Sequence, residues 1–185
     1  MIRILSLITT LLLPVATMAA GTRVETPTGR VEACLPSDGH GLLAATRGGL
    51  VERDRAGKTR RIWTAMNGLP GTRTWTIATV GGETWVGTER GVARFKRSPS
   101  GLVLHATHRS APVRAILAHQ GVVYLGTWGG GVLRRVGATA NFKRLPLVGK
   151  PATGPERRVT SLAIHAGRLH VGTAGGGGGN GVFLG

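Results

Sequence analysis

The chain has 185 residues, with 24 Lys or Arg against 8 Asp or Glu, so its formal net charge at pH 7 is +16. Its single cysteine, Cys34, excludes an internal disulfide, and the apolar neighbours of Cys34 predict a buried thiol. So few acids argue against the paired carboxylates of a glycosidase and the Asp-rich loops of a calcium repeat. We therefore expect no metal and no cofactor.

The N-terminus has the order of segments that signal peptidase recognises. Arg3 precedes an apolar run from Ile4 to Val15, and small residues follow at 16–20. The run is shorter than the roughly 20 apolar residues that a membrane span needs, and Pro14 lies near its end. We predict a signal peptide at residues 1–20. The mature chain, residues 21–185, is then expected to be periplasmic or secreted, without stable membrane insertion.

The basic residues are spread along the chain, and their densest pairs are Arg60-Arg61, Arg134-Arg135 and Arg157-Arg158. A positive excess first indicates nucleic acid. An exported protein meets lipid head groups and acidic glycans instead, so we predict no nucleic-acid partner. Surface charge that merely maintains solubility is the alternative.

Four segments share a register defined by a threonine. The threonines recur roughly 40 residues apart, a period typical of repeat folds, and are Thr46, Thr88, Thr127 and Thr173. A glycine precedes three of them, which indicates close packing of strands near an axis. Counting without gaps, an aliphatic residue stands eleven residues before each, namely Leu35, Ile77, Ile116 and Leu162.

Within each copy, short runs of β-branched and aromatic residues alternate with Gly, Pro, Asp or Ser turns, which predicts strands. In the second copy the expected strands are Thr74–Thr79, Glu83–Thr88, Val92–Lys96 and Leu102–His105. Four short antiparallel strands per repeat are typical of a β-propeller blade. The predicted fold is all-β, a β-propeller of about four four-stranded blades, with blades at roughly 31–65, 74–105, 113–144 and 159–185.

The second copy carries a family resemblance. It reads Asn67-Gly68-Leu69-Pro70, then a strand, then Trp85-Val86-Gly87-Thr88 and Gly91-Val92-Ala93-Arg94-Phe95. This resembles the repeat of the two-component regulator propeller family, which reads N-G-L-P, a strand, W-I-G-T and G-L-x-R-F. The third copy is close to this pattern, whereas the first and fourth are degenerate. The resemblance implies a ligand-binding periplasmic sensor propeller, commonly of seven blades.

The fourth copy ends soon after its third strand begins, so three assemblies stay open. The chain is an incomplete arc or fragment, a four-bladed ring that Thr22–Thr26 completes with the missing strand, or an arc that closes by self-association.

One face of a propeller collects the loops that join the second strand to the third and the fourth strand to the next blade. The ligand-binding candidates in these loops are Arg47, Arg73, Arg90, Arg109, Trp128, Arg157 and Arg158. Arginine forks and a tryptophan face suit anionic or sugar ligands; ordinary polar loops are the alternative. Trp75 and Trp85 lie in expected strands and are predicted to pack between blades.

No combination of nucleophile, base and acid suggests catalysis. We expect a non-enzymatic binding or sensing module whose partner is a small molecule, a glycan or a protein. The alternatives are a structural or protein-interaction fragment that assembles through open blade edges, and a propeller lyase or hydrolase.

Overall fold

The computed structural model describes residues 30–37, 41–137, 141–146, 157–174 and 182–184. For residues 182–184 it describes the backbone alone. The predicted signal peptide at 1–20, the segment Thr22–Thr26 and the glycine run 175–179 lie outside these residues. No helix in the described ranges has the length and hydropathy of a membrane span.

The described residues form antiparallel sheets that follow one another along the chain, and each sheet corresponds to one blade. Blade 1 contains β1 (Val31–Ser37), β2 (Gly41–Thr46), β3 (Gly49–Arg53) and β4 (Thr59–Trp63). Blade 2 contains β5 (Thr74–Val80), β6 (Glu83–Thr88), β7 (Gly91–Ser98) and β8 (Gly101–Arg109). Blade 3 contains β9 (Val113–His119), β10 (Val122–Thr127), β11 (Gly131–Val136) and β12 (Lys143–Leu145). Blade 4 contains β13 (Val159–His165), β14 (Arg168–Thr173) and β15 (Val182–Leu184). A 3-10 turn, η1 (Ala65–Asn67), lies between blades 1 and 2.

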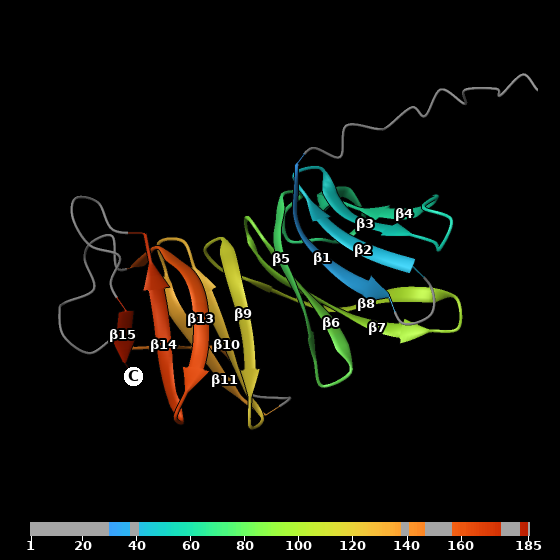
Figure 1. The fold of residues 1–185 in the computed structure, drawn as a ribbon. Helices are drawn as coiled ribbons and strands as arrows, with labels where there is room; N and C mark the ends of the chain where they lie inside the picture. Colours follow the sequence, from blue (N-terminus) through green and yellow to red (C-terminus); the bar gives the residue numbers. More distant parts are fainter. Residues whose placement is uncertain (1–29, 38–40, 138–140, 147–156, 175–181, 185) are drawn as a thin grey trace, which may run out of the picture.

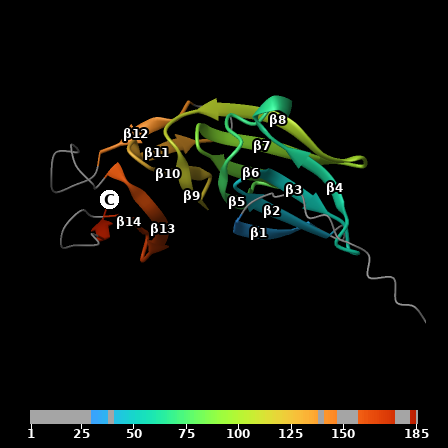
Figure 2. The ribbon, with the colours of Figure 1, turned by 90° about the horizontal axis from the view of Figure 1, so that it is seen from above.

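The four blades lie side by side in an arc (Figure 1). Seen from above, the first strand of each blade lies on the concave side, and β8 and β12 lie on the convex side (Figure 2). Blades 1 and 4 occupy opposite ends of this arc, and among the described strands β15 pairs with β14 alone. The all-β propeller fold is confirmed, and the described residues form an open arc. The strand that would close a ring, Thr22–Thr26, is outside them.

The strands expected in the second copy are confirmed. β6 has the predicted bounds, while β5, β7 and β8 are longer than predicted by one to five residues. β8 is extended most, since it pairs with β7 from Ser98↔Gly101 to Gly91↔Arg109.

The register predicted for the first copy is wrong by one residue. In blade 2, Ile77 pairs with Val86, two residues before the threonine, but in blade 1 the residue that pairs with Ala44 is Cys34 and not Leu35. The reason is the first hairpin, in which the three residues 38–40 replace the two-residue turn of the other blades. Cys34 is also exposed and not buried as predicted.

The repeated threonines close the turn that follows them. Thr46, Thr88 and Thr127 each donate a side-chain hydrogen bond to the carbonyl oxygen of the glycine that opens the next strand, at 2.7–3.0 Å. All three are buried. Because a buried hydroxyl must find a partner, threonine at this position fixes the tight turn between the second and third strands.

The glycine before the threonine permits close contact between blades, as predicted. A Cβ atom on Gly87 would lie 2.6 Å from the carbonyl oxygen of Val113 in blade 3, and one on Gly126 would lie 2.6 Å from Cγ1 of Val159 in blade 4. The main apolar clusters accordingly lie between successive blades. They are centred on Phe95 and Trp63, on Trp85 and Val113, and on Val132 and Val159.

Candidate ligand-binding site

The first strand of each blade carries an irregularity at its upper end in Figure 1, where one extra residue interrupts the pairing with the second strand. The inserted residues occupy equivalent positions and are Glu32, Trp75, Arg114 and Thr160. Such bulges turn a side chain away from its regular direction in the sheet. Four chemically different side chains are therefore presented at the same level of the arc.

Arginines and tryptophans from blades 2, 3 and 4 stack in a row at this level. The Cζ atom of Arg114 lies 3.5 Å from the ring centroid of Trp75 and 5.0 Å from that of Trp128. Arg73 lies 4.9 Å from the Trp75 ring, and Arg158 lies 5.6 Å from the Trp128 ring. These cation–π contacts hold the guanidinium groups in place. We call Arg73, Trp75, Arg114, Trp128 and Arg158 the arginine–tryptophan row.

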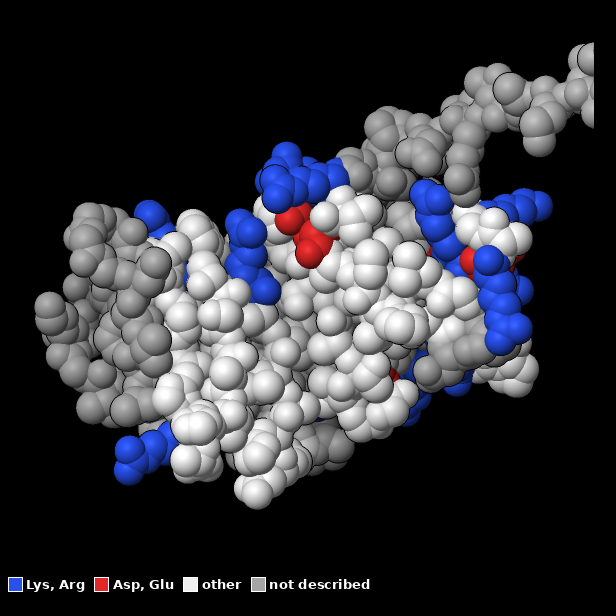
Figure 3. Space-filling model, in the orientation of Figure 1, with Lys and Arg blue, Asp and Glu red and all other residues white. Residues whose placement is uncertain are grey.

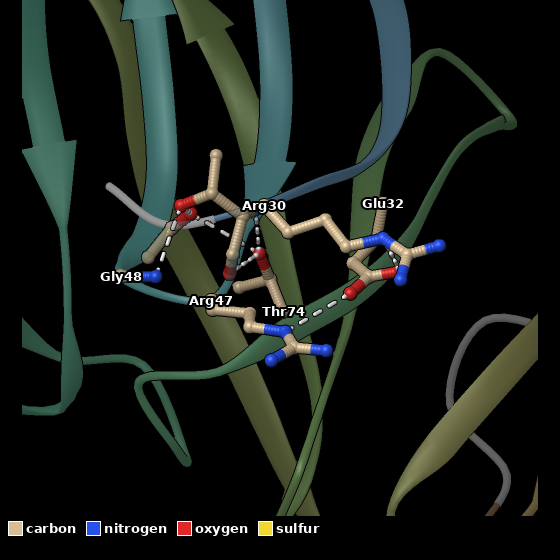
Figure 4. Close-up of polar contacts among 7 residues, drawn as sticks. Arg30, Glu32, Arg47, Gly48 and Thr74 are labelled. Carbon is tan, nitrogen blue, oxygen red and sulfur yellow. Dashed lines mark hydrogen bonds and ion pairs between the residues drawn. The ribbon is translucent and has the colours of Figure 1, made fainter. Parts of the chain in front are cut away.

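Blade 1 contributes an acid to the same region. Glu32 lies between two arginines, with Oε1 3.4 Å from Nε of Arg47 and Oε2 4.0 Å from Nε of Arg30 (Figure 4). The carboxylate is largely buried, whereas both arginines are well exposed. Glu32 therefore anchors the blade 1 end of the site.

The row is positively charged. The pKa of Arg114 lies below the ordinary value for arginine because partial burial disfavours its charged form; Glu32 offsets part of this effect and the neighbouring Arg73 lowers the pKa further. Within the part of the chain that the structure describes, the Nε atoms of Arg114 and Arg157 and the Nε1 atom of Trp75 are buried without a hydrogen-bond partner. These buried donors and like charges favour an anionic ligand over a cationic one.

The structure gathers some of the predicted site residues and separates others. Arg73, Trp128 and Arg158 belong to the row, Arg157 accepts a hydrogen bond from Gly129 through its carbonyl oxygen beside the row, and Arg47 pairs with Glu32. Arg90 and Arg109 are exposed at the beginning of β7 and the end of β8, where the carbonyl oxygen of Arg90 accepts a hydrogen bond from the backbone N–H of Ser110.

Trp75 and Trp85, both predicted to pack between blades, differ in their burial. Trp85 is fully buried between blades 2 and 3, as expected. Trp75 is half-buried and belongs to the row. Trp128, predicted as an exposed platform, is half-buried with two guanidinium groups over its ring, which reduces the surface available to a sugar.

Sequence reasoning missed Glu32, Trp75 and Arg114 as site residues. A signal was present, because Trp75 and Arg114 each stand thirteen residues before the threonine of their blade. A repeat position whose residue type differs from blade to blade, as this one does, is a candidate for ligand binding.

The basic side chains gather at the borders of the concave side. In Figure 3 they lie along its upper edge and at both ends of the arc, while the middle of this surface is largely uncharged. The row belongs to the upper edge because its residues lie at or beside the beginnings of β5, β9 and β13. The candidate site is thus a basic rim above a neutral concave wall.

The fold is similar to that of solved structures. Two crystal structures of the extracellular domain of BT4673 from B. thetaiotaomicron, described as a one-component and as a hybrid two-component system, match with TM-scores of 0.64 and 0.63 and identities of 22% and 20%. Each match covers 82% of this chain and 21% of that domain, so the chain spans about a fifth of its length. The computationally designed protein Ika4 matches with a TM-score of 0.54 and 16% identity, over 78% of this chain and 85% of the design. At these identities the similarity is one of fold. Neither a family model nor a curated protein matches the sequence.

Proposed function

We propose that this chain is an exported, non-enzymatic binding or sensing module of the β-propeller type, whose ligand is an anion such as an acidic glycan. By its repeat motif it resembles the periplasmic sensor region of two-component regulators. The description of BT4673 as an extracellular domain of a one-component or hybrid two-component system supports this role and a periplasmic or secreted location.

The observation that carries the proposal is the arginine–tryptophan row. Three guanidinium groups from three blades are held against two indole rings. Among the described residues, Glu32 is the carboxylate that raises the pKa of Arg114 and so offsets part of its lowering. Because arginine presents several N–H donors in a rigid fork, it binds carboxylate and sulfate groups through paired hydrogen bonds. An anionic ligand along the rim would relieve the repulsion between these arginines.

Calorimetric titration tests the proposal. An acidic oligosaccharide such as oligogalacturonate is compared with a neutral oligosaccharide of the same length. The triple variant Arg73→Gln, Arg114→Gln, Arg158→Gln is expected to lose about tenfold or more in affinity for the acidic sugar, because each lost arginine removes charge-assisted hydrogen bonds.

A second triple variant controls for net charge. Arg55→Gln, Arg60→Gln and Arg134→Gln remove the same charge from exposed residues outside the row, and affinity is expected to stay within about threefold of the unmodified chain. Equal losses in the two triple variants would show that binding follows overall charge, which contradicts the proposed site. Equal binding of the neutral sugar would contradict an anionic ligand.

A further inference from the structure

The repeat position of Phe95 in blade 2 holds an arginine in blades 1 and 3, namely Arg53 and Arg135. Arg135 in β11 and Phe95 in β7 each lie four residues after the glycine that opens the strand, and their cross-strand partners are equivalent. Phe95 is fully buried between blades 1 and 2, where its ring packs edge-on against Trp63 at 5.3 Å. Arg135, 7% exposed, lies at the corresponding place between blades 2 and 3.

The side chain of Arg135 forms no hydrogen bond or ion pair with the described residues, and its Nε atom is buried without a partner among them. The nearby carboxylate of Glu83 is already engaged, with Arg94 at 2.8 Å, His105 at 3.8 Å and Lys96 at 3.9 Å. The guanidinium of Arg135 instead lies between aromatic rings, 4.7 Å from the centroid of Trp85 and 5.3 Å from that of Phe142.

This environment is unfavourable for an unpaired charge. The pKa of Arg135 lies below the ordinary value for arginine, chiefly because of burial; Arg94 lowers it further, and Glu83 offsets part of the effect. Buried charges are normally paired, since desolvation is costly and ring contacts compensate it in part. The indole N–H of Trp85 is also buried without an acceptor from the described residues. Arg135 and Trp85, which lie next to each other between blades 2 and 3, therefore both have a buried N–H donor without an acceptor from the described residues.

A pocket of about 440 Å³ opens directly beside these two residues. It lies between the β5–β6 and β9–β10 turns, at the bottom of Figure 1 and thus at the opposite end of the strands from the row. Val80, Val122 and Val123 supply apolar walls, and Arg94, Arg135 and Glu83 supply charges. Its size and its mixture of apolar walls with few polar groups are typical of small-molecule sites.

We propose that this pocket binds a small organic monocarboxylate, with the carboxylate bound by Arg135 and the apolar remainder against the valines and Trp85. The fork of a guanidinium matches a carboxylate. The repulsion of Glu83 disfavours ligands with two or more negative charges. The site is separate from the arginine–tryptophan row and does not depend on it.

The test uses benzoate and hexanoate as probes, with benzamide and hexanamide as neutral counterparts. Binding is followed by calorimetry and by tryptophan fluorescence, because Trp85 forms part of the wall. Both carboxylates are expected to bind and both amides to fail. Arg135→Gln and Arg135→Phe are expected to weaken carboxylate binding about tenfold or more, the effect of losing a charged hydrogen bond.

The neighbouring arginine provides the control. Arg134→Gln removes the same charge from the adjacent position of β11, but Arg134 is exposed and does not line this pocket. The affinity of the Arg134→Gln variant for the carboxylates is expected to stay within about twofold of that of the unmodified chain. Arg135→Phe restores the residue type of the equivalent position in blade 2, so it should fold with an unchanged or raised Tm.

Three results would overturn the inference. The first is unchanged carboxylate affinity in folded Arg135→Gln and Arg135→Phe variants. The second is equal binding of the amides. The third is the absence of carboxylate binding to the unmodified chain up to about 10 mM, beyond the weak end of small-ligand affinities. A loss confined to the row variants and absent from the Arg135 variants would place the bound anion at the upper edge.

Discussion

Replacing Thr74 by Val removes one hydroxyl that connects blades 1 and 2. This hydroxyl accepts a hydrogen bond from the backbone N–H of Thr46 at 2.6 Å and donates to the carbonyl oxygens of Thr46 at 2.8 Å and Gly49 at 3.1 Å (Figure 4). Thr74 is fully buried. Val31, Val113 and Val159 occupy the equivalent position of the other blades, since each pairs with the threonine of its own blade.

The expected loss follows from these contacts. Valine has nearly the shape of threonine, so no cavity forms, and the cost comes from the lost hydrogen bonds. The accepted hydrogen bond contributes about 1 kcal/mol, and the donated bond, shared between two carbonyl oxygens, contributes as much. The buried N–H of Thr46 that loses this acceptor adds a further penalty. The free energy of unfolding should therefore fall by about 2–3 kcal/mol.

Urea denaturation followed by circular dichroism measures this loss. Thr79→Val on the same strand is the matched control, because Thr79 is exposed, and it should change stability by less than about 0.5 kcal/mol. If unfolding proceeds blade by blade, the loss should appear in the transition that separates blade 1. A Thr74→Val variant as stable as the Thr79→Val control would refute the role of this hydroxyl between blades.

Two further predictions concern the backbone and the pH dependence. Gly91 has φ +126, and a Cβ atom there would overlap the carbonyl oxygen of His108; Gly91→Ala should therefore cost more than about 3 kcal/mol in the same denaturation assay. Gly81→Ala, at φ +56 with nothing within 4 Å, should cost about 1–2 kcal/mol, and equal costs for the two variants would contradict the steric argument. The pKa of His108 is lowered from 6.5 by burial and by Arg135; the folded chain therefore binds fewer protons than the unfolded chain as the pH falls below about 6.5, and stability decreases there. An NMR titration of the unmodified chain should place the midpoint of His108 below pH 6.5. In the Arg135→Gln variant the midpoint should lie closer to 6.5, because a neighbouring positive charge is lost. A midpoint at or above 6.5 in the unmodified chain would contradict the lowered pKa.

Much of the blade could be predicted because it depends on local order. Alternating β-branched residues and glycine turns placed the strands of blade 2 within a few residues of their observed bounds. The threonine register was correct from the threonine onward because its turn is closed by residues that are near neighbours in sequence. The register of β1 was wrong because residues 38–40 lengthen the hairpin without changing the pattern on either side.

The sequence by itself determined the period, the β-strands and the close approach of blades at the glycines, since these follow from alternation, turn chemistry and side-chain size. The tertiary structure alone decided which side chains meet. Arg134 and Arg135 are identical neighbours in the sequence, yet the pleat of β11 exposes one and buries the other between blades 2 and 3. Arg114 and Trp75 stack across two blades because a bulge, which exists only when two strands are paired, turns both toward the same rim. Such contacts join residues about one repeat apart, and no local pattern specifies them.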